Sequence, residues 1–284
     1  MKQHPLITHQ PPDESTHFPS RLIVLTALMV AVTLNATTVL SNSTNRQDSS
    51  IAFSTVSETG TLPSESTPLN IQVSHDGEVM GASHLVTDFS EVMLAIDPTN
   101  PLHLLGTSKF FFDLAAYKHY TGVFETYDSG YTWDQLQPDG LEVYTKTSDP
   151  VTTFDELGNS YFTLLTIGPL GLDMLKKPVD GAWEAPVTVD RTTNADKQWI
   201  IGDQDPRGDS PYAGNLYISW ADVTINNQEN AHIMFSRSAD RNLTWSPPIT
   251  LTTGFVEGSM LGVALDGTVY VTNGAIDTRK NNWG

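Results

Sequence analysis

One turn pattern occurs twice in the chain, and it restricts the fold more than any other feature. In both copies a hydroxyl residue is followed two positions later by Asp, then two positions later by Gly or Asn, and then by Thr and Trp. The Asp carboxylate can accept backbone N–H bonds, Gly and Asn tolerate positive φ, and a Trp ring can cover the hairpin. The sequence therefore predicts two equivalent hairpin turns, formed by Thr126, Asp128, Gly130, Thr132 and Trp133 and by Ser238, Asp240, Asn242, Thr244 and Trp245.

Short apolar runs recur around these turns in groups that predict four-stranded antiparallel blades. A blade cannot bury both of its faces alone, so blades must stack around an axis. We expect an all-β chain, a β-propeller, in residues 70–284; a closed four-bladed ring that recruits residues 70–90 is the alternative. The expected strands lie at 91–97, 102–112 and 122–126, at 149–155 and 160–167, at 196–203, 216–220 and 232–237, and at 260–265 and 268–272, with a weakened turn at 180–183.

The two turns resemble the Asp-box, or BNR repeat, of sialidase-like β-propellers of the secreted bacterial glycosyl-hydrolase type. Residues 97–101 and 214–217 resemble short sequence segments of the same protein family. The resemblance implies a six- or seven-bladed parent, of which this chain covers three to four blades. It also implies that the turns lie on the outer rim, between the third and fourth strands of a blade. Their Asp and Trp residues are therefore expected to be structural, although an Asp beside a Trp also invites a catalytic interpretation.

The N-terminal part of the chain divides by composition into three segments. Residues 1–20 form a polar tail, residues 21–40 contain an apolar run after Arg21, and residues 41–69 are rich in Ser and Thr. The apolar run predicts a signal peptide or an uncleaved membrane anchor, with a buried core helix as the remaining alternative. The third segment predicts a flexible linker. We therefore expect an extracellular or cell-surface protein that meets a membrane only through its N-terminal segment.

Charge and cysteine content exclude several classes of partner and site. The chain has 33 acidic and 15 basic residues, for a net charge of −18, and no cysteine. Such a charge argues against nucleic acid or an anionic bilayer surface as a partner. The absence of cysteine excludes disulfides and thiolate-ligated metals. We expect no cofactor, and no oligomeric state follows from the sequence.

Three acidic residues precede the expected innermost strands at similar positions. Glu91 stands six positions before Asp97, Asp149 stands six before Asp155, and Asp196 occupies nearly the same place before Asp203. If the innermost strands line the axis, these carboxylates meet at the mouth of the channel. They could form an acid and base pair for glycosidic cleavage, bind a cation, or cap the incoming loops.

The acids after these strands predict turns rather than chemistry. Asp97, Asp155, Asp203 and Asp266 stand where the first hairpin of each blade begins, and Asp is favoured there for its local side-chain bonds. Asp205 and Asp209 follow Asp203 and suggest a calcium loop, but the spacing does not match the EF-hand pattern. We therefore predict no metal site.

The resemblance implies a function directed at glycans, but this sequence departs from the sialidase pattern at one motif. Sialidases resemble one another in an arginine triad that clamps the substrate carboxylate, with one Arg in an aromatic-Arg-x-Pro context, and this sequence has no such motif. We therefore expect an exo-glycosidase-type propeller that acts on or binds extracellular glycans, without authentic sialidase activity. Alternatives are a non-catalytic surface propeller for protein or polysaccharide, or a truncated copy without activity. The candidate residues are Glu91, Asp149 and Asp196 for catalysis and Lys109, Lys197 and Trp199 for substrate contact.

Overall fold

The computed structural model describes residues 22–27, 88–113, 115–191, 194–205, 207–223, 231–253 and 256–275. These residues form four β-sheets, and their one helical element is the short 3-10 turn η1 (Leu141–Val143). Within the described ranges, no helix has the length and apolar character needed to cross a membrane. The expectation of an all-β fold is confirmed.

Three of the sheets are complete four-stranded antiparallel blades, and their strands follow one another in chain order. Each predicted strand of these blades is present, with a shift of a few residues at its ends. The first blade contains β2 (Asp88–Ile96), β3 (Leu104–Asp113), β4 (Lys118–Thr126) and β5 (Asp134–Leu136); the second contains β6 (Lys146–Phe154), β7 (Ser160–Ile167), β8 (Gly171–Lys177) and β9 (Val187–Asp190); the third contains β10 (Ala195–Gly202), β11 (Leu216–Asp222), β12 (His232–Ser238) and β13 (Ile249–Thr253).

The fourth sheet is made from the two ends of the described chain. Strands β14 (Val256–Val263) and β15 (Val269–Ala275) pair antiparallel, and β1 (Leu22–Ala27) pairs parallel with β15. Strand β1 takes the first part of the apolar run in which we expect a signal peptide or anchor. The rest of that segment, the polar tail and the linker lie outside the described residues, so the export assignment stays a prediction.

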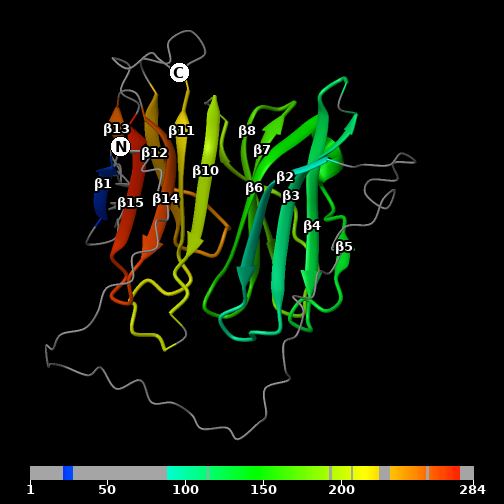
Figure 1. The fold of residues 1–284 in the computed structure, drawn as a ribbon. Coiled ribbons are helices and arrows are strands. Elements are labelled where there is room, and N and C mark those ends of the chain that lie inside the picture. Colours follow the sequence, from blue (N-terminus) through cyan, green and yellow to red (C-terminus); the bar gives the residue numbers. More distant parts are fainter. Residues whose placement is uncertain are drawn as a thin grey trace, which may run out of the picture.

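The third and fourth sheets lie on one side of the molecule, and the first and second sheets lie on the other (Figure 1). The innermost strands β2, β6, β10 and β14 contact one another in succession. Each hydrophobic core lies between two blades rather than within one. Residues of the first and second blades share one core, those of the second and third share another, and those of the third and fourth share the last. This is the architecture of a β-propeller.

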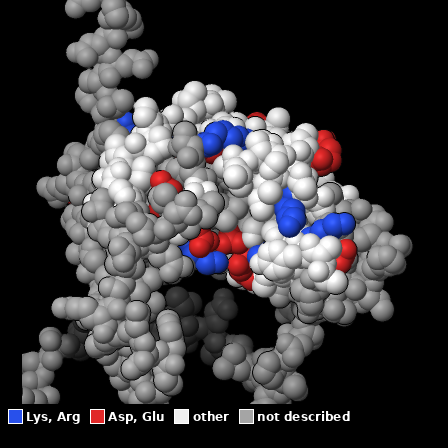
Figure 2. Space-filling view, turned by 90° about the horizontal axis from the view of Figure 1, so that it is seen from above, with Lys and Arg blue, Asp and Glu red and all other residues white. Residues whose placement is uncertain are grey.

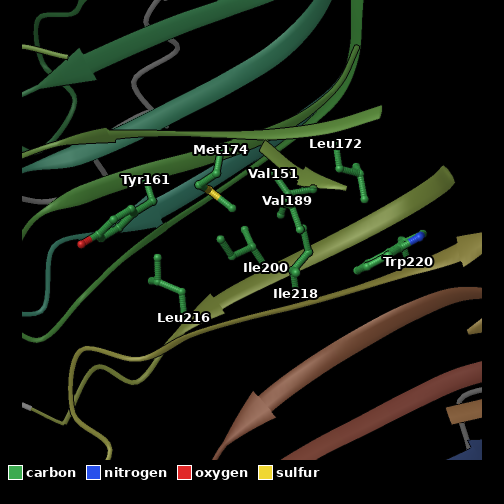
Figure 3. Packing of buried hydrophobic residues seen from close by; sticks show 9 residues of the cluster. All are labelled: Val151, Tyr161, Leu172, Met174, Val189, Ile200, Leu216, Ile218 and Trp220. Carbon is green, nitrogen blue, oxygen red and sulfur yellow. The ribbon is translucent and has the colours of Figure 1, made fainter. Parts of the chain in front are cut away.

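The core between the second and third blades shows this interdigitation directly (Figure 3). Tyr161 and Met174 from the second blade face Ile200 and Ile218 from the third. Tyr161, Met174 and Ile218 are fully buried. Because each blade supplies half of a shared core, neither can keep that surface away from water alone.

The Asp residues of the two predicted turns accept the same hydrogen bonds, and both turns connect the third and fourth strands of a blade. In the first, between β4 and β5, Asp128 Oδ1 accepts bonds from Thr126 Oγ1 and from the Thr132 backbone N–H, both at 2.8 Å. Gly130 has a φ of 88°, and the Trp133 ring N–H donates to its carbonyl at 3.0 Å. We call residues 126–133 and 238–245 the acidic turns.

The second acidic turn, between β12 and β13, repeats this arrangement with one substitution. Asp240 Oδ1 accepts bonds from Ser238 Oγ at 2.8 Å and from the Thr244 backbone N–H at 2.9 Å. Asn242 replaces Gly and holds a φ of 74°, and its side-chain oxygen accepts the Trp245 ring N–H at 2.9 Å. The predicted equivalence of the two turns is confirmed.

Candidate functional site

Each innermost strand is interrupted by a β-bulge at the same point. The residue that opens the bulge has positive φ in all four blades, and in the fourth blade it is Gly258, with a φ of 63°. In the other three blades it carries a side chain: Glu91 at 54°, Asp149 at 51° and Lys197 at 47°. The register shifts that mark the bulges lie between Ser90 and Met93, Ser148 and Val151, Asp196 and Trp199, and Glu257 and Ser259.

The bulge residue of the third blade differs from the one expected from the sequence. The residue equivalent to Glu91 and Asp149 is Lys197, one position later than Asp196. A shared backbone bond confirms the alignment, because in every blade the residue six positions after the bulge residue donates its N–H across the first hairpin. These donors are Asp97, Asp155, Asp203 and Ala264, at 2.8–3.1 Å from their acceptors, so Asp266 lies two residues beyond the equivalent place.

Positive φ is costly for a residue with a side chain, and the fourth blade shows that the bulge does not require one. A left-handed backbone costs a non-glycine residue about 1–2 kcal/mol. Strained residues of this kind gather at functional sites, where the surrounding structure maintains them. Three charged side chains in the strained position therefore identify the bulges as the candidate site.

The three bulge side chains converge on one another from three blades. Lys197 Nζ lies 3.0 Å from Asp149 Oδ2 and 3.3 Å from Glu91 Oε1. Lys197 Nζ therefore bridges the Glu91 and Asp149 carboxyl groups. Ser148 Oγ donates to Asp149 Oδ1, and Lys109 Nζ lies 3.8 Å from Glu91 Oε2. Seen from above, acidic and basic side chains lie side by side near the centre of the molecule (Figure 2).

The pKa values of the Glu91 and Asp149 carboxyl groups are shifted in opposite directions. Burial raises the pKa of Glu91, and its hydrogen bond with the Asp149 carboxylate and the repulsion from that charge raise it further. Burial alone would also raise the pKa of Asp149, but hydrogen bonds with Glu91, Ser148 and Lys197 outweigh it and lower that pKa. Glu91 is therefore the weaker acid of the two, and Asp149, beside Lys197, is the stronger.

A pocket of about 550 Å³ opens at this cluster. It brings together five of the six residues predicted for catalysis and substrate contact, namely Glu91, Asp149, Asp196, Lys109 and Lys197. Asp196 stands at its side, where its carboxylate accepts the Lys197 backbone N–H at 2.9 Å and keeps a side-chain exposure of 38%. Asp196 therefore caps the incoming loop, which is one of the three roles considered for these acids. We call this space the carboxylate pocket.

An aromatic wall that the sequence did not indicate lines the carboxylate pocket beside Lys109. Tyr117 is 56% exposed and has a φ of 50°. Lys109 Nζ lies 5.6 Å from the centre of the Tyr117 ring. An exposed aromatic ring next to hydrogen-bonding groups is a surface on which a sugar ring can lie, with its apolar face on the aromatic plane.

His119, from strand β4, also lines the carboxylate pocket and was missed by sequence reasoning. Its Nδ1 lies 2.7 Å from the Thr147 carbonyl oxygen, to which it donates. Burial lowers the pKa of His119, with Lys109 and Lys146 adding to the effect, so that the ring is neutral near pH 7. Only the pairing of Phe111 with His119 across β3 and β4 brings this ring near Lys109, and no spacing in the sequence reveals that pairing.

Trp199, the sixth predicted residue, lines a neighbouring pocket of about 370 Å³. This second space is bounded by residues from all four innermost strands, and we call it the axial pocket. Glu91, Asp149 and Lys197 line both pockets, so the charged cluster is the wall between them.

The remaining predicted acids lie in local networks away from both pockets. Asp97 accepts the Thr99 backbone N–H at 2.8 Å, and Asp203 accepts a bond from Ser210 Oγ at 2.6 Å. Asp205 accepts the Ser210 backbone N–H at 2.9 Å. In the described ranges, no group of three or more His, Cys, Asp or Glu residues is placed to hold a metal ion. The turn interpretation therefore describes these residues.

Comparison with known proteins gives only distant likenesses. No family model matches the chain, and no curated protein matches it. Solved structures that are similar include an exo-beta-1,3-galactanase from Clostridium thermocellum, with a TM-score of 0.45, 11% identity, and coverage of 62% of this chain and 40% of the other. An endo-arabinase from Bacteroides thetaiotaomicron has a TM-score of 0.41 and 14% identity, with coverage of 61% of this chain and 66% of the other. The Trypanosoma rangeli sialidase has a TM-score of 0.45 and 12% identity, with coverage of 66% of this chain and 35% of the other.

The chain thus spans between 35% and 66% of the length of these three proteins. The likenesses are too weak to carry an argument about chemistry. The propeller architecture is established by the sheet order and the cores between blades.

Proposed function

We propose that this protein is an exported glycoside hydrolase of the propeller type that acts on extracellular glycans. The observation that carries the proposal is the pair of carboxyl groups of Glu91 and Asp149, which meet at Lys197 from two strained bulges and have pKa values shifted in opposite directions. Glycosidic cleavage requires one carboxyl group that donates a proton and one that reacts as a carboxylate, and opposite pKa shifts suit the two groups to these roles. The Asp-box assignment of the acidic turns agrees with this proposal and gives them a structural role.

We further propose a retaining reaction, in which one carboxyl group is the nucleophile and the other acts first as the acid and then as the base. In the first step Asp149 bonds to the anomeric carbon, the glycosidic C–O bond breaks, and the Glu91 proton passes to the leaving oxygen. In the second step water attacks the same carbon, its proton returns to Glu91, and the bond to Asp149 breaks.

The substrate class follows from the lining of the carboxylate pocket. Among the described residues that line it, the cations are Lys109 and Lys197, and no arginine is present. Lys197 is already paired with Glu91 and Asp149, so the pocket offers no bidentate clamp for a sugar carboxylate. A neutral glycan that stacks on Tyr117 fits this lining better than a sialoside.

The activity test is a panel of fluorogenic glycosides that includes a sialoside. We expect turnover of a neutral glycoside, and a loss of about 10²–10⁴-fold in kcat/KM for Glu91→Gln and for Asp149→Asn. Asp134→Asn, an exposed acid on β5, is the matched control and should leave the rate unchanged. Hydrolysis that persists unchanged in both site variants would refute the assignment of the two carboxyl groups.

The pH profile of kcat/KM should be bell-shaped and acidic. The rate falls at low pH when Asp149 takes up a proton, below the ordinary value of 3.8 because its pKa is lowered. It falls again at higher pH when Glu91 loses its proton, above the ordinary value of 4.5 because its pKa is raised. Any residual activity of Glu91→Gln should lack the upper limb, and an unchanged upper limb would assign that titration to another group.

Export can be tested apart from activity. Residues 1–40, fused to a reporter that lacks its own signal, should carry the reporter across the membrane, because an apolar run after Arg21 is typical of an export segment. A fusion in which Ile23 and Val24 are replaced by Asp should keep it inside. Equal export of both fusions would contradict the proposal.

A non-catalytic glycan-binding propeller is the second candidate, and one observation favours it. Lys197 bridges Glu91 and Asp149, so the cluster also serves as an electrostatic tie between three blades. In that case, glycan binding should be measurable by calorimetry without turnover, and Tyr117→Ala should abolish it. Cleavage that depends on Asp149 would exclude this candidate.

A further inference from the structure

The axial pocket differs from the carboxylate pocket in the chemistry of its walls. Its apolar walls come from every blade: Val92 and Met93 from β2, Pro150 and Val151 from β6, Trp199 from β10 and Met260 from β14. Val92 is 69% exposed and Met260 is 54% exposed. Apolar side chains left in contact with water around a common hollow mark a place where an apolar group can bind.

The bulges explain why two unlike pockets lie side by side. In each of the first three blades the bulge contains two residues, and the first of them lines both pockets. The second residue, which is Val92, Pro150 or Gln198, lines the axial pocket alone. A bulge redirects consecutive side chains in this way, so the charged cluster forms a wall with a polar space on one side and an apolar space on the other.

We propose that the axial pocket holds the apolar leaving group of the substrate, and that the substrate is a glycoside with an aryl or alkyl aglycone. The inference rests on the proposed function. The sugar lies in the carboxylate pocket against Tyr117, and the glycosidic oxygen lies at Glu91. The aglycone then passes into the axial pocket, where it removes apolar surface of Val92, Trp199 and Met260 from water. After proton transfer from Glu91 the aglycone leaves as its neutral hydroxyl compound.

The bond changes are those of the retaining reaction above, and no further reactant is needed. The volume of about 370 Å³ lies in the usual range for ligand pockets. A polysaccharide chain would instead place hydroxyl groups against these apolar walls, which offer them few hydrogen-bond partners.

The test uses 4-methylumbelliferone, the leaving group by itself, so that it does not depend on turnover. We expect it to bind the wild-type protein in a fluorescence titration. Val92→Ser together with Met260→Ser should weaken that binding about tenfold, because apolar contact is lost. Leu94→Ser is the matched control, since Leu94 lies on the same strand and is 56% exposed but does not line the axial pocket. Equal affinity of the wild type and the double variant would overturn the inference.

Rates separate this inference from the proposed function. The double variant should lower kcat/KM for a 4-methylumbelliferyl glycoside more than kcat/KM for the methyl glycoside of the same sugar, because only the larger aglycone reaches the axial pocket. Binding of 4-methylumbelliferone that the double variant weakens, with no turnover of any glycoside, would refute the proposed hydrolase and keep the apolar pocket. Turnover of both glycosides without binding of 4-methylumbelliferone would refute this inference alone.

Discussion

At the scale of single residues, the bulge positions carry both a backbone cost and a chemical role. Glu91, Asp149 and Lys197 have positive φ where the fourth blade has Gly258. The fourth blade is thus an internal comparison that shows what the fold prefers when no side chain is needed. A residue retained against its backbone preference implies a benefit outside folding.

At position 91, a Gly variant should be more stable than an Ala variant, which is the reverse of the usual order of stability in a strand. In an ordinary strand Gly is less stable than Ala, by roughly 0.5–1 kcal/mol. Because Glu91 has positive φ and only glycine relieves the strain, we expect the free energy of unfolding of Glu91→Gly to be about 1 kcal/mol larger than that of Glu91→Ala. Urea unfolding measures this difference. Both variants should be inactive.

Gly258→Ala gives the reciprocal measurement. A Cβ at this position meets no atom within 4 Å, so any loss comes from the backbone conformation. We expect a loss of about 1 kcal/mol. A gain in stability for Gly258→Ala, or an Ala variant at Glu91 as stable as the Gly variant, would show that the bulges are not strained.

A buried histidine should give the protein a pH-dependent stability near neutrality. His103 lies between Asp97 and Glu125, with both ring nitrogens 2.9 Å from a carboxylate oxygen. Burial would lower the pKa of His103, but the hydrogen bonds with Glu125 and Asp97 outweigh it and raise that pKa above 6.5. The charged ring therefore stabilises the fold fully below pH 6.5, and this contribution is lost as the pH rises through the raised value.

Urea unfolding at several pH values between 6 and 9 measures this contribution. The free energy of unfolding should fall with pH in the wild type, and His103→Gln should remove that part of the slope. His232→Gln, at β12 in the third blade, serves as the control and should keep the slope. An identical pH dependence in His103→Gln and the wild type would contradict the assignment.

At the scale of elements, the acidic turns hold the outer edges of the first and third blades. Each joins the third and fourth strands, and its Asp accepts bonds from the hydroxyl residue before it and from the Thr after it. These contacts are all local in sequence. That is why the pattern is readable in the sequence, and why the turns lie apart from the two pockets.

Asp240→Ala should therefore weaken the fold without changing the chemistry. It removes the acceptor for Ser238 Oγ and for both the N–H and Oγ1 of Thr244. Because the two bonds to Thr244 are exposed to water, we expect a loss of only about 1 kcal/mol in the free energy of unfolding. The kcat/KM should stay at the wild-type value, with Asp139→Asn as the control for both measurements. A large loss of activity in a folded Asp240→Ala protein would give this turn a role that we do not assign to it.

At the scale of the whole molecule, stability belongs to the interfaces between blades. The three cores each draw residues from two sheets, and ion pairs such as that between Arg241 of the third blade and Glu156 of the second also cross these interfaces. Loss of one blade would expose the core of its neighbour. The described blades should therefore unfold together.

Ile218→Ala tests this coupling between the second and third blades. Ile218 is fully buried in their shared core, and truncation should cost about 2–5 kcal/mol. Circular dichroism and tryptophan fluorescence should still report one coincident transition, shifted to lower urea. Leu243→Ala, at a residue that is 68% exposed, should leave the midpoint unchanged. Two separated transitions in Ile218→Ala would show that the blades unfold independently.

Features that depend on neighbours along the chain can be predicted from the sequence. The two acidic turns, the strands that flank them and the grouping of strands into blades follow from local turn chemistry and from alternating apolar residues. The acids Glu91 and Asp149 were also identified, because a fixed spacing before the first hairpin recurs in both blades.

Which side chains meet depends on the folded arrangement of the blades. The equivalent position in the third blade is held by Lys197 rather than Asp196, because the bulge begins one residue later. Tyr117 and His119 join the carboxylate pocket only through the pairing of β3 with β4 and the stacking of the first blade on the second. The opposite pKa shifts of Glu91 and Asp149 likewise need burial and contacts across blades, which depend on distances in space and not on separation along the chain.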